Sequence, residues 1–183
     1  MSLSQSKPVL LGDSILRRLN GRYTDYFNAL SSEFCVSGQT VADLIELAKV
    51  KREELRGKKV MLMIGTNDIL RNNTKIRICV QLRSLSRRLR RLHCNIVWCE
   101  ILPIPRLEWQ ATTLDLISDV NAYIRTFEPS GVKIVFSHSA FCSEGKAIRS
   151  LFCKYLGASE RVDLVHPCRA GLGKLFCFLY PEL

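Results

Sequence analysis

The sequence predicts an α/β protein, a three-layer α/β/α sandwich of flavodoxin-like type with about five parallel strands. Short apolar runs recur along the 183 residues, and they are continuous rather than alternating, which indicates strands with both sheet faces covered. The segments between these runs carry apolar residues at helical spacing. Strands that alternate with helices favour right-handed crossovers and therefore a parallel sheet.

The expected strands follow one another along the whole chain. The run at 60–64 is the clearest, because no polar residue interrupts it before Gly65. The run that begins at Ile96 continues through the polar residue Glu100 and stops at Pro103. The five expected strands, of which the second is the weakest, are 9–11, 34–36, 60–64, 96–102 and 132–136.

The expected helices lie between and after these strands. Residues 40–50 place Val41, Leu44, Ile45 and Ala48 on one face, and Thr40 suits the N-cap position. The arginine-rich segment has leucines at 82, 85, 89 and 92, with its arginines on the opposite side. Further helices are expected at 114–127, 147–156 and 171–180.

Composition and charge pattern predict one domain at 8–183, preceded by a disordered tail at 1–7. The tail lacks the apolar core of a signal peptide, and no stretch approaches the length of a membrane helix, so we expect a cytoplasmic protein, with the nucleus left open. The eight cysteines include no C-x-x-C pair and no zinc-like cluster with histidine. We therefore expect buried free thiols, no metal and no cofactor.

Four short polar pieces stand just after apolar runs or in loops: 12–14, 37–40, 65–68 and 163–166. Three of them follow the first three expected strands. Because ligands of open parallel sheets bind beyond the carboxyl ends of the strands, these loops should converge at one edge. Together the four pieces supply a hydroxyl nucleophile, candidate oxyanion donors, and an imidazole with a carboxylate, which is the set that acyl transfer needs.

In this order the four pieces resemble the blocks of the SGNH/GDSL hydrolase superfamily, over nearly the whole chain. The resemblance implies that Ser14 is the nucleophile, His166 the general base, and Asp163 the carboxylate that orients the imidazole. It also implies an oxyanion hole made by the backbone N–H groups of Ser14 and Gly38 and the side-chain amide of Asn67. Members of the superfamily hydrolyse esters, thioesters and acyl groups, so a small ester or acyl substrate is expected.

Other polar residues near these pieces have structural interpretations. We expect Asp13 and Asp68 to hydrogen-bond neighbouring loops rather than to join the triad. His93 and His138 are expected to be structural, although His138 follows the last expected strand and could line the cleft.

The formal net charge of +10 favours an acidic partner and leaves a second interpretation open. The chain is similar in character to the SGNH-like C-terminal domain of the insect germ-plasm protein Oskar, a resemblance that implies RNA binding without catalysis. Either RNA or another polyanion could bind the arginine-rich helix, or that helix is simply a solvated face. A third interpretation is that arginines one turn beyond Ser14 attract an anionic acyl substrate. The arginines concerned are Arg83, Arg87, Arg90 and Arg91 for the polyanion, and Arg17 and Arg18 for the acyl substrate.

Overall fold

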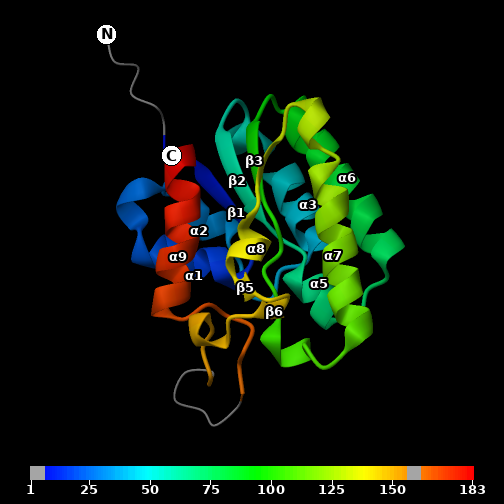
Figure 1. Ribbon diagram of the computed structural model, residues 1–183. Helices are drawn as coiled ribbons and strands as arrows, with labels where there is room; N and C mark the ends of the chain where they lie inside the picture. The colour runs from blue at the N-terminus through cyan, green and yellow to red at the C-terminus, as the bar shows by residue number, and fades with distance from the viewer. Residues whose placement is uncertain (1–6, 156–161) are drawn as a thin grey trace.

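The computed structural model describes residues 7–155 and 162–183. Its centre is a parallel sheet in the order β1 (Val9–Gly12), β2 (Lys59–Met63), β3 (Asn95–Cys99) and β4 (Lys133–Val135) (Figure 1). The α/β class and the parallel sheet predicted from the sequence are therefore confirmed.

The expected strand at 34–36 is wrong as a strand. Phe34 ends helix α2 (Ser31–Phe34), and only Cys35 pairs with the sheet, in a single parallel bridge to Gly12. The apolar run is three residues long, and α2 uses the first of them, so too little extended chain remains for a ladder. Cys35 nevertheless lies on the outer side of β1, which is where the second strand of a flavodoxin-like sheet runs.

Helices cover both faces of the sheet, as a three-layer sandwich requires. One face packs against α1 (Ser14–Arg22) and α9 (Arg169–Leu179), and the other against α3 (Val41–Val50), α6 (Lys75–Arg91) and α7 (Ala111–Arg125) (Figure 1). Alternate residues of a strand pack into two separate hydrophobic cores, one on each face of the sheet. Val9 and Leu11 pack into the core under α3, α6 and α7, whereas Leu10 packs into the core under α1 and α9.

The predicted helix signals are confirmed for α3, α6, α7 and α9. At α3, Thr40 is the N-cap and forms a capping box with Asp43. Shorter elements connect the main ones: η1 (Thr24–Tyr26), α4 (Arg52–Leu55), α5 (Thr66–Leu70), η2 (Pro105–Leu107), η3 (Glu128–Ser130), α8 (Ser137–Ala140) and η5 (Tyr180–Glu182).

The expected helix at 147–156 is wrong over the residues that the structure describes. A two-stranded ribbon, β5 (Cys142–Ser143) with β6 (Lys146–Ala147), is followed by a single turn, η4 (Arg149–Leu151). The chain then runs extended against the His166 loop: Cys153 N–H donates to the carbonyl of His166 at 2.8 Å. Backbone pairing with a distant segment replaces the helical hydrogen bonds that the local pattern favours.

Of the expected disordered tail at 1–7, residues 1–6 lie outside the described part of the chain, and Lys7 is exposed. Within 7–155 and 162–183, no helix is both long and apolar enough to cross a membrane. All eight cysteines are free, as predicted, but only Cys35 and Cys99 are buried, and Cys177 is exposed. Most of the thiols lie in partly exposed positions at helix and loop surfaces, so the expectation of burial was wrong for them.

Candidate active site

Ser14 stands at a sharp turn between the first strand and the first helix. β1 ends at Gly12, Asp13 is the N-cap of α1, and Ser14 is the first residue of that helix. The carboxylate of Asp13 accepts the N–H of Ile15 at 2.9 Å. A first-turn N–H has no acceptor within its own helix, so the N–H of Ser14 stays available, in the positive field of the helix N-terminus.

The structure brings Ser14, His166 and Asp163 together although 152 positions separate Ser14 from His166. Ser14 Oγ lies 2.8 Å from His166 Nε2, and His166 Nδ1 lies 2.8 Å from Asp163 Oδ1. Asp163 is only 3% exposed and also accepts the backbone N–H groups of Val165 and His166. A buried carboxylate held in this way fixes the orientation of the imidazole toward the serine.

The Gly38 loop and the start of α5 complete the surroundings of Ser14. Gly38 has φ +77°, a backbone conformation that residues with a Cβ rarely adopt. Its carbonyl accepts a hydrogen bond from Arg71 Nη2 at 2.9 Å. Gly65, which precedes α5, has φ +122°, and a Cβ there would lie 2.7 Å from Ile101 Cδ1. The positive φ thus favours glycine at both turns, and both turns lie near Ser14 and Asn67 at the carboxyl edge of the sheet.

The side-chain amide of Asn67 already has two acceptors. Its Nδ2 donates to the Gln39 carbonyl at 3.0 Å and to Asp13 Oδ2 at 3.4 Å. Since an amide nitrogen carries two hydrogens, binding an oxyanion through Asn67 would require it to release one of these bonds. The longer bond, to Asp13, is the weaker one.

The carboxyls of Asp13 and Asp68 hold loops together, as expected from the sequence. Burial raises the pKa of Asp13 to about 7, and the negative charge of Asp68 adds to the effect. Asp68 accepts the N–H of Val41 at 3.0 Å and the Asn73 amide at 3.2 Å, and burial raises its pKa as well.

Two hollows meet at Ser14. The inner cavity has a volume of about 150 Å³ and reaches inward past Thr66, Leu70 and Val165. The outer groove measures about 520 Å³ and is lined by Arg17 and Arg18 of α1 and by the Gly38 loop. Ser14, Asn67 and His166 line both hollows. The structure thus places Arg17 and Arg18 beside the site, in agreement with the spacing argument from the sequence.

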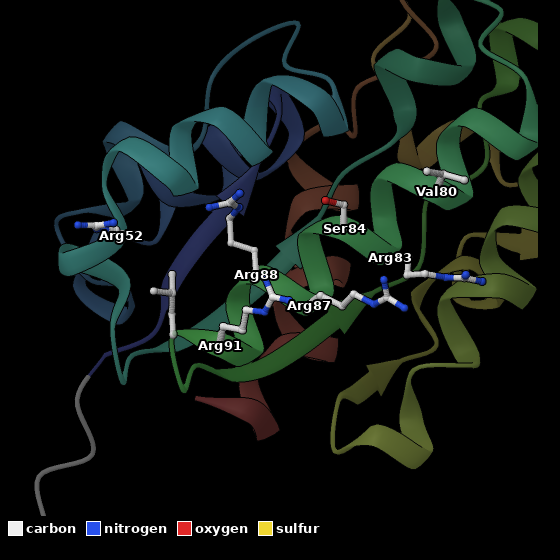
Figure 2. Close-up of a pocket in the computed structure, with 8 residues that line it drawn as sticks. Arg52, Val80, Arg83, Ser84, Arg87, Arg88 and Arg91 are labelled. Carbon is white, nitrogen blue, oxygen red and sulfur yellow. The ribbon is translucent and has the colours of Figure 1, made fainter.

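The arginine-rich helix bears a separate groove of about 440 Å³, which we call the arginine groove (Figure 2). Arg83, Arg87 and Arg91 line it as expected, but Arg90 does not. The groove also includes two arginines that were not among the predicted anion contacts, Arg88 of α6 and Arg52 of α4. Arg90 is exposed on the same helix, and its contact with a polyanion stays a prediction.

The remaining histidines lie outside the hollows at Ser14. The Nδ1 atom of His138 lies 2.9 Å from the carbonyl of Ile101, and the backbone N–H of His138 donates to the carboxylate of Glu100. His93 has φ +56° just after the end of α6 and is exposed. In the described part of the chain, no group of three histidine, cysteine or acidic side chains could hold a metal ion.

Sequence reasoning missed Arg71 and Arg106 near Ser14, and it assigned no role to Gln39 within the 37–40 piece. Gln39 and Arg71 fix Asn67 and Gly38 through the bonds described above. Arg106 lines the inner cavity, and its backbone N–H donates to the Leu164 carbonyl in the loop that carries His166. Only the position of Arg71 just after the 65–68 piece could have drawn attention to it.

The family model described as the OSK domain matches residues 7–162, which is most of the chain. The chain belongs to the OSK domain family. This OSK domain shares its fold with the solved OSK domain of Drosophila Oskar, with a TM-score of 0.80 at 20% identity, over 95% of this chain and 86% of that one. No curated protein matches it closely enough to count as a relative.

The OSK domain is also similar to bacterial hydrolases in fold. A GDSL-like lipase from Bacteroides thetaiotaomicron has a TM-score of 0.76 at 18% identity, over 97% of this chain and 87% of that one. A putative acylhydrolase from Bacteroides fragilis has a TM-score of 0.72 at 19% identity, over 98% and 90%. The resemblance to the SGNH/GDSL superfamily, predicted from the four sequence pieces, is therefore confirmed at the level of fold, and so is the resemblance to Oskar, which was predicted from the basic character of the chain.

Proposed function

We propose that this OSK domain is a serine ester or acyl hydrolase with Ser14 as its nucleophile. The observation that carries the proposal is the chain of contacts from Ser14 Oγ to His166 Nε2 at 2.8 Å and from His166 Nδ1 to Asp163 at 2.8 Å. A serine hydroxyl is a poor nucleophile until a positioned base takes its proton, and this chain supplies the base and its orienting carboxylate.

In the proposed reaction, Ser14 Oγ attacks the carbonyl carbon of the ester while His166 accepts the hydroxyl proton. The same imidazole then gives that proton to the leaving alcohol, and an acyl-Ser14 intermediate remains. A water molecule, deprotonated by His166, hydrolyses this intermediate and restores the serine. Asp163 stabilises the imidazolium that forms in each half of the reaction.

The negative charge that develops on the substrate oxygen needs hydrogen-bond donors. The N–H of Ser14 at the start of α1 and the N–H of Gly38 are the two proposed donors from the backbone. Asn67 is the proposed third donor, after its amide exchanges the 3.4 Å bond to Asp13 for the oxyanion.

The test of this proposal is labelling with a fluorophosphonate probe together with hydrolysis of p-nitrophenyl acetate. Wild type should be labelled and should turn the ester over, and Ser14→Ala should lose both, with a fall in kcat of at least about 10³-fold. Ser139→Ala, which changes an exposed serine on α8, is the matched control and should behave as wild type. A wild-type protein with neither labelling nor turnover, or a Ser14→Ala variant labelled like wild type, would refute the proposal.

A second candidate function, RNA binding, is favoured by the arginine groove. Five arginines line this groove, and Figure 2 shows them gathered over α6, with Arg52 contributed by α4. The Nε of Arg88 is buried and has no hydrogen-bond partner among the described residues. A cluster of guanidinium groups with an unsatisfied donor suits the phosphates of a nucleic-acid backbone.

RNA binding is tested by filter binding of single-stranded RNA at several salt concentrations. The double variant Arg87→Glu with Arg91→Glu should lose at least about tenfold in affinity at low salt, and its log–log salt slope should fall by about 1.4. The control Lys146→Glu with Lys154→Glu makes the same change in net charge at exposed positions outside the groove. Equal losses in both double variants would show that only the net charge matters, and the groove would have no specific role.

A further inference from the structure

The two hollows at Ser14 differ in size, enclosure and charge, and this difference bears on the substrate of the proposed hydrolase. An ester places its acyl group and its alcohol on opposite sides of the carbon that Ser14 attacks. If each hollow receives one of these parts, the residues that line it describe the chemistry of that part. The inference below therefore rests on the proposed function.

The inner cavity suits a short acyl group. With a volume of about 150 Å³ it is the smaller of the two hollows at Ser14, against about 520 Å³ for the outer groove. Ile15, Leu70 and Val165 supply apolar surface, and Thr66 contributes a buried hydroxyl without a partner among the described residues. The charged side chains that line the cavity are Asp13, Asp163 and Arg106, so the carboxyl groups outnumber the single arginine and an anionic group is less favoured here than in the outer groove.

The outer groove carries positive charge. Arg17 and Arg18 follow Ser14 by three and four positions on α1, so the helix places all three on one side. Arg17 is exposed and forms no ion pair within the described residues, and the side chain of Arg18 is 35% exposed, with Nη1 3.9 Å from Asp163 Oδ2. No acidic side chain lines this groove.

A further hollow extends the positive charge along α1. It measures about 450 Å³, shares Arg18 with the outer groove, and adds Arg22 and Arg169. We call it the α1–α9 groove. It also has no acidic residue in its lining. From Ser14 outward, the two grooves thus present arginine side chains in succession, and no acidic residue lines either groove; the carboxylate of Asp163 lies near one of them, Arg18.

We propose that the substrate is the ester of a short acyl group with an alcohol that carries two or more phosphate charges, as a phosphorylated nucleoside does. The acyl group occupies the inner cavity, and the phosphates lie in the outer groove and the α1–α9 groove. Ser14 Oγ forms a bond to the acyl carbon, the ester C–O bond breaks, and the Ser14 proton passes through His166 to the leaving alcohol. Water then releases the carboxylic acid from Ser14, and the phosphates leave unchanged on the alcohol.

A series of three esters that differ only in phosphate tests this proposal: 3′-O-acetyl-2′-deoxyadenosine, its 5′-monophosphate and its 5′-diphosphate. The value of kcat/KM should rise with each phosphate, by up to about fivefold per step, as expected for contacts between exposed charges. Raising the salt concentration from 50 to 500 mM should reduce this preference.

Arginine variants show which groove is responsible for the rise in kcat/KM with each phosphate. Arg17→Gln should lower the ratio of the kcat/KM values for monophosphate and uncharged ester, and Arg22→Gln should lower mainly the gain from the second phosphate. Arg77→Gln, at an exposed position on α6, is the matched control and should leave every ratio unchanged. Equal kcat/KM for all three esters would overturn the proposal, and so would a preference for 3′-O-succinyl over 3′-O-acetyl esters, which would place the anion in the inner cavity.

Binding to Ser14→Ala separates this inference from the hydrolase proposal. Calorimetry should show that 2′-deoxyadenosine 5′-diphosphate binds more tightly than 2′-deoxyadenosine, and that Arg17→Gln weakens the difference. If wild type turns over no ester but this binding difference is present, the hydrolase proposal fails and the anion site stands. If both nucleosides bind equally, or neither binds, the anion site is refuted.

Discussion

At the scale of single residues, Asp13 combines two tasks next to the proposed nucleophile. Its carboxyl caps α1 through the N–H of Ile15 and accepts the amide of Asn67, while only 1% of the residue is exposed. Burial is the main cause of its raised pKa of about 7. The strand-to-helix turn that presents Ser14 is therefore built on a carboxyl that gains or loses its proton near neutral pH.

The raised pKa predicts a pH-dependent stability. In the unfolded chain Asp13 loses its proton near its ordinary pKa of 3.8, whereas the folded protein holds the proton until about pH 7. Between these values the folded state binds more protons, so the contribution of Asp13 to stability is complete below pH 3.8 and falls as the pH rises toward 7.

Asp13→Asn keeps the helix cap and cannot ionise. The free energy of unfolding of this variant, relative to wild type, should therefore rise between pH 4 and pH 7 with a slope of up to about 1.4 kcal/mol per pH unit, and should level off above pH 7. Urea unfolding at a series of pH values measures the difference. A difference that stays flat from pH 4 to pH 7 would contradict the raised pKa.

At the scale of elements, Asn121 of α7 joins the helix layer to the end of β3. Its Oδ1 accepts the N–H of Ile101 at 2.8 Å, and its Nδ2 donates to the carbonyl of the same residue at 3.0 Å. The side chain is buried. Because β3 ends at Cys99, the backbone of Ile101 has no strand partner, and the amide of Asn121 supplies the two hydrogen bonds that a neighbouring strand would otherwise make. Ile101 also packs against Gly65, so this pair of bonds supports the turn before Asn67.

Removal of the Asn121 amide should destabilise the protein by about 2–4 kcal/mol, because the buried N–H of Ile101 loses its acceptor and the carbonyl of Ile101 keeps only its contact with His138. For a chain of this size the melting temperature should fall by roughly 5–15 °C, which calorimetry measures. Asn121→Leu keeps most of the side-chain volume and should cost about as much as Asn121→Ala. Asp115→Ala, at an exposed position on the same helix, should stay within about 0.5 kcal/mol of wild type. A Leu variant as stable as wild type would show that the two bonds contribute little.

At the scale of the whole molecule, the two candidate sites lie at opposite ends of the sheet. Ser14 and Asn67 follow the carboxyl ends of β1 and β2, whereas α6 runs back from that edge and its last turn, with Arg91, precedes the start of β3 at Asn95. The arginine groove and the hollows at Ser14 share no residue. The ester and RNA experiments are therefore independent, and each can succeed when the other fails.

Much of the fold and the membership of the candidate site could be predicted from the sequence. The run at 60–64 is apolar enough to be a buried strand in any packing, and Thr40 with Asp43 defines a helix start locally. Three of the four polar pieces follow expected strands, and in a parallel sheet the ends of those strands share one edge. The order of strands and loops was therefore sufficient to bring Ser14, Gly38 and Asn67 together, whereas the place of His166 was implied by the resemblance to the SGNH/GDSL superfamily.

The sequence by itself determined the class of fold and the main helices, because these follow from local periodicity and from the geometry of parallel sheets, and its resemblance to the SGNH/GDSL superfamily implied the Ser14–His166–Asp163 set. Only the tertiary structure decided that Cys35 forms one bridge instead of a strand and that 149–151 is a single turn held near the His166 loop. It alone showed that Asn67 is bonded to Gln39 and that Arg52 joins the arginine groove. Each of these depends on contacts between distant segments, whose hydrogen bonds and burial outweigh the preference of a few residues for a helix or a strand.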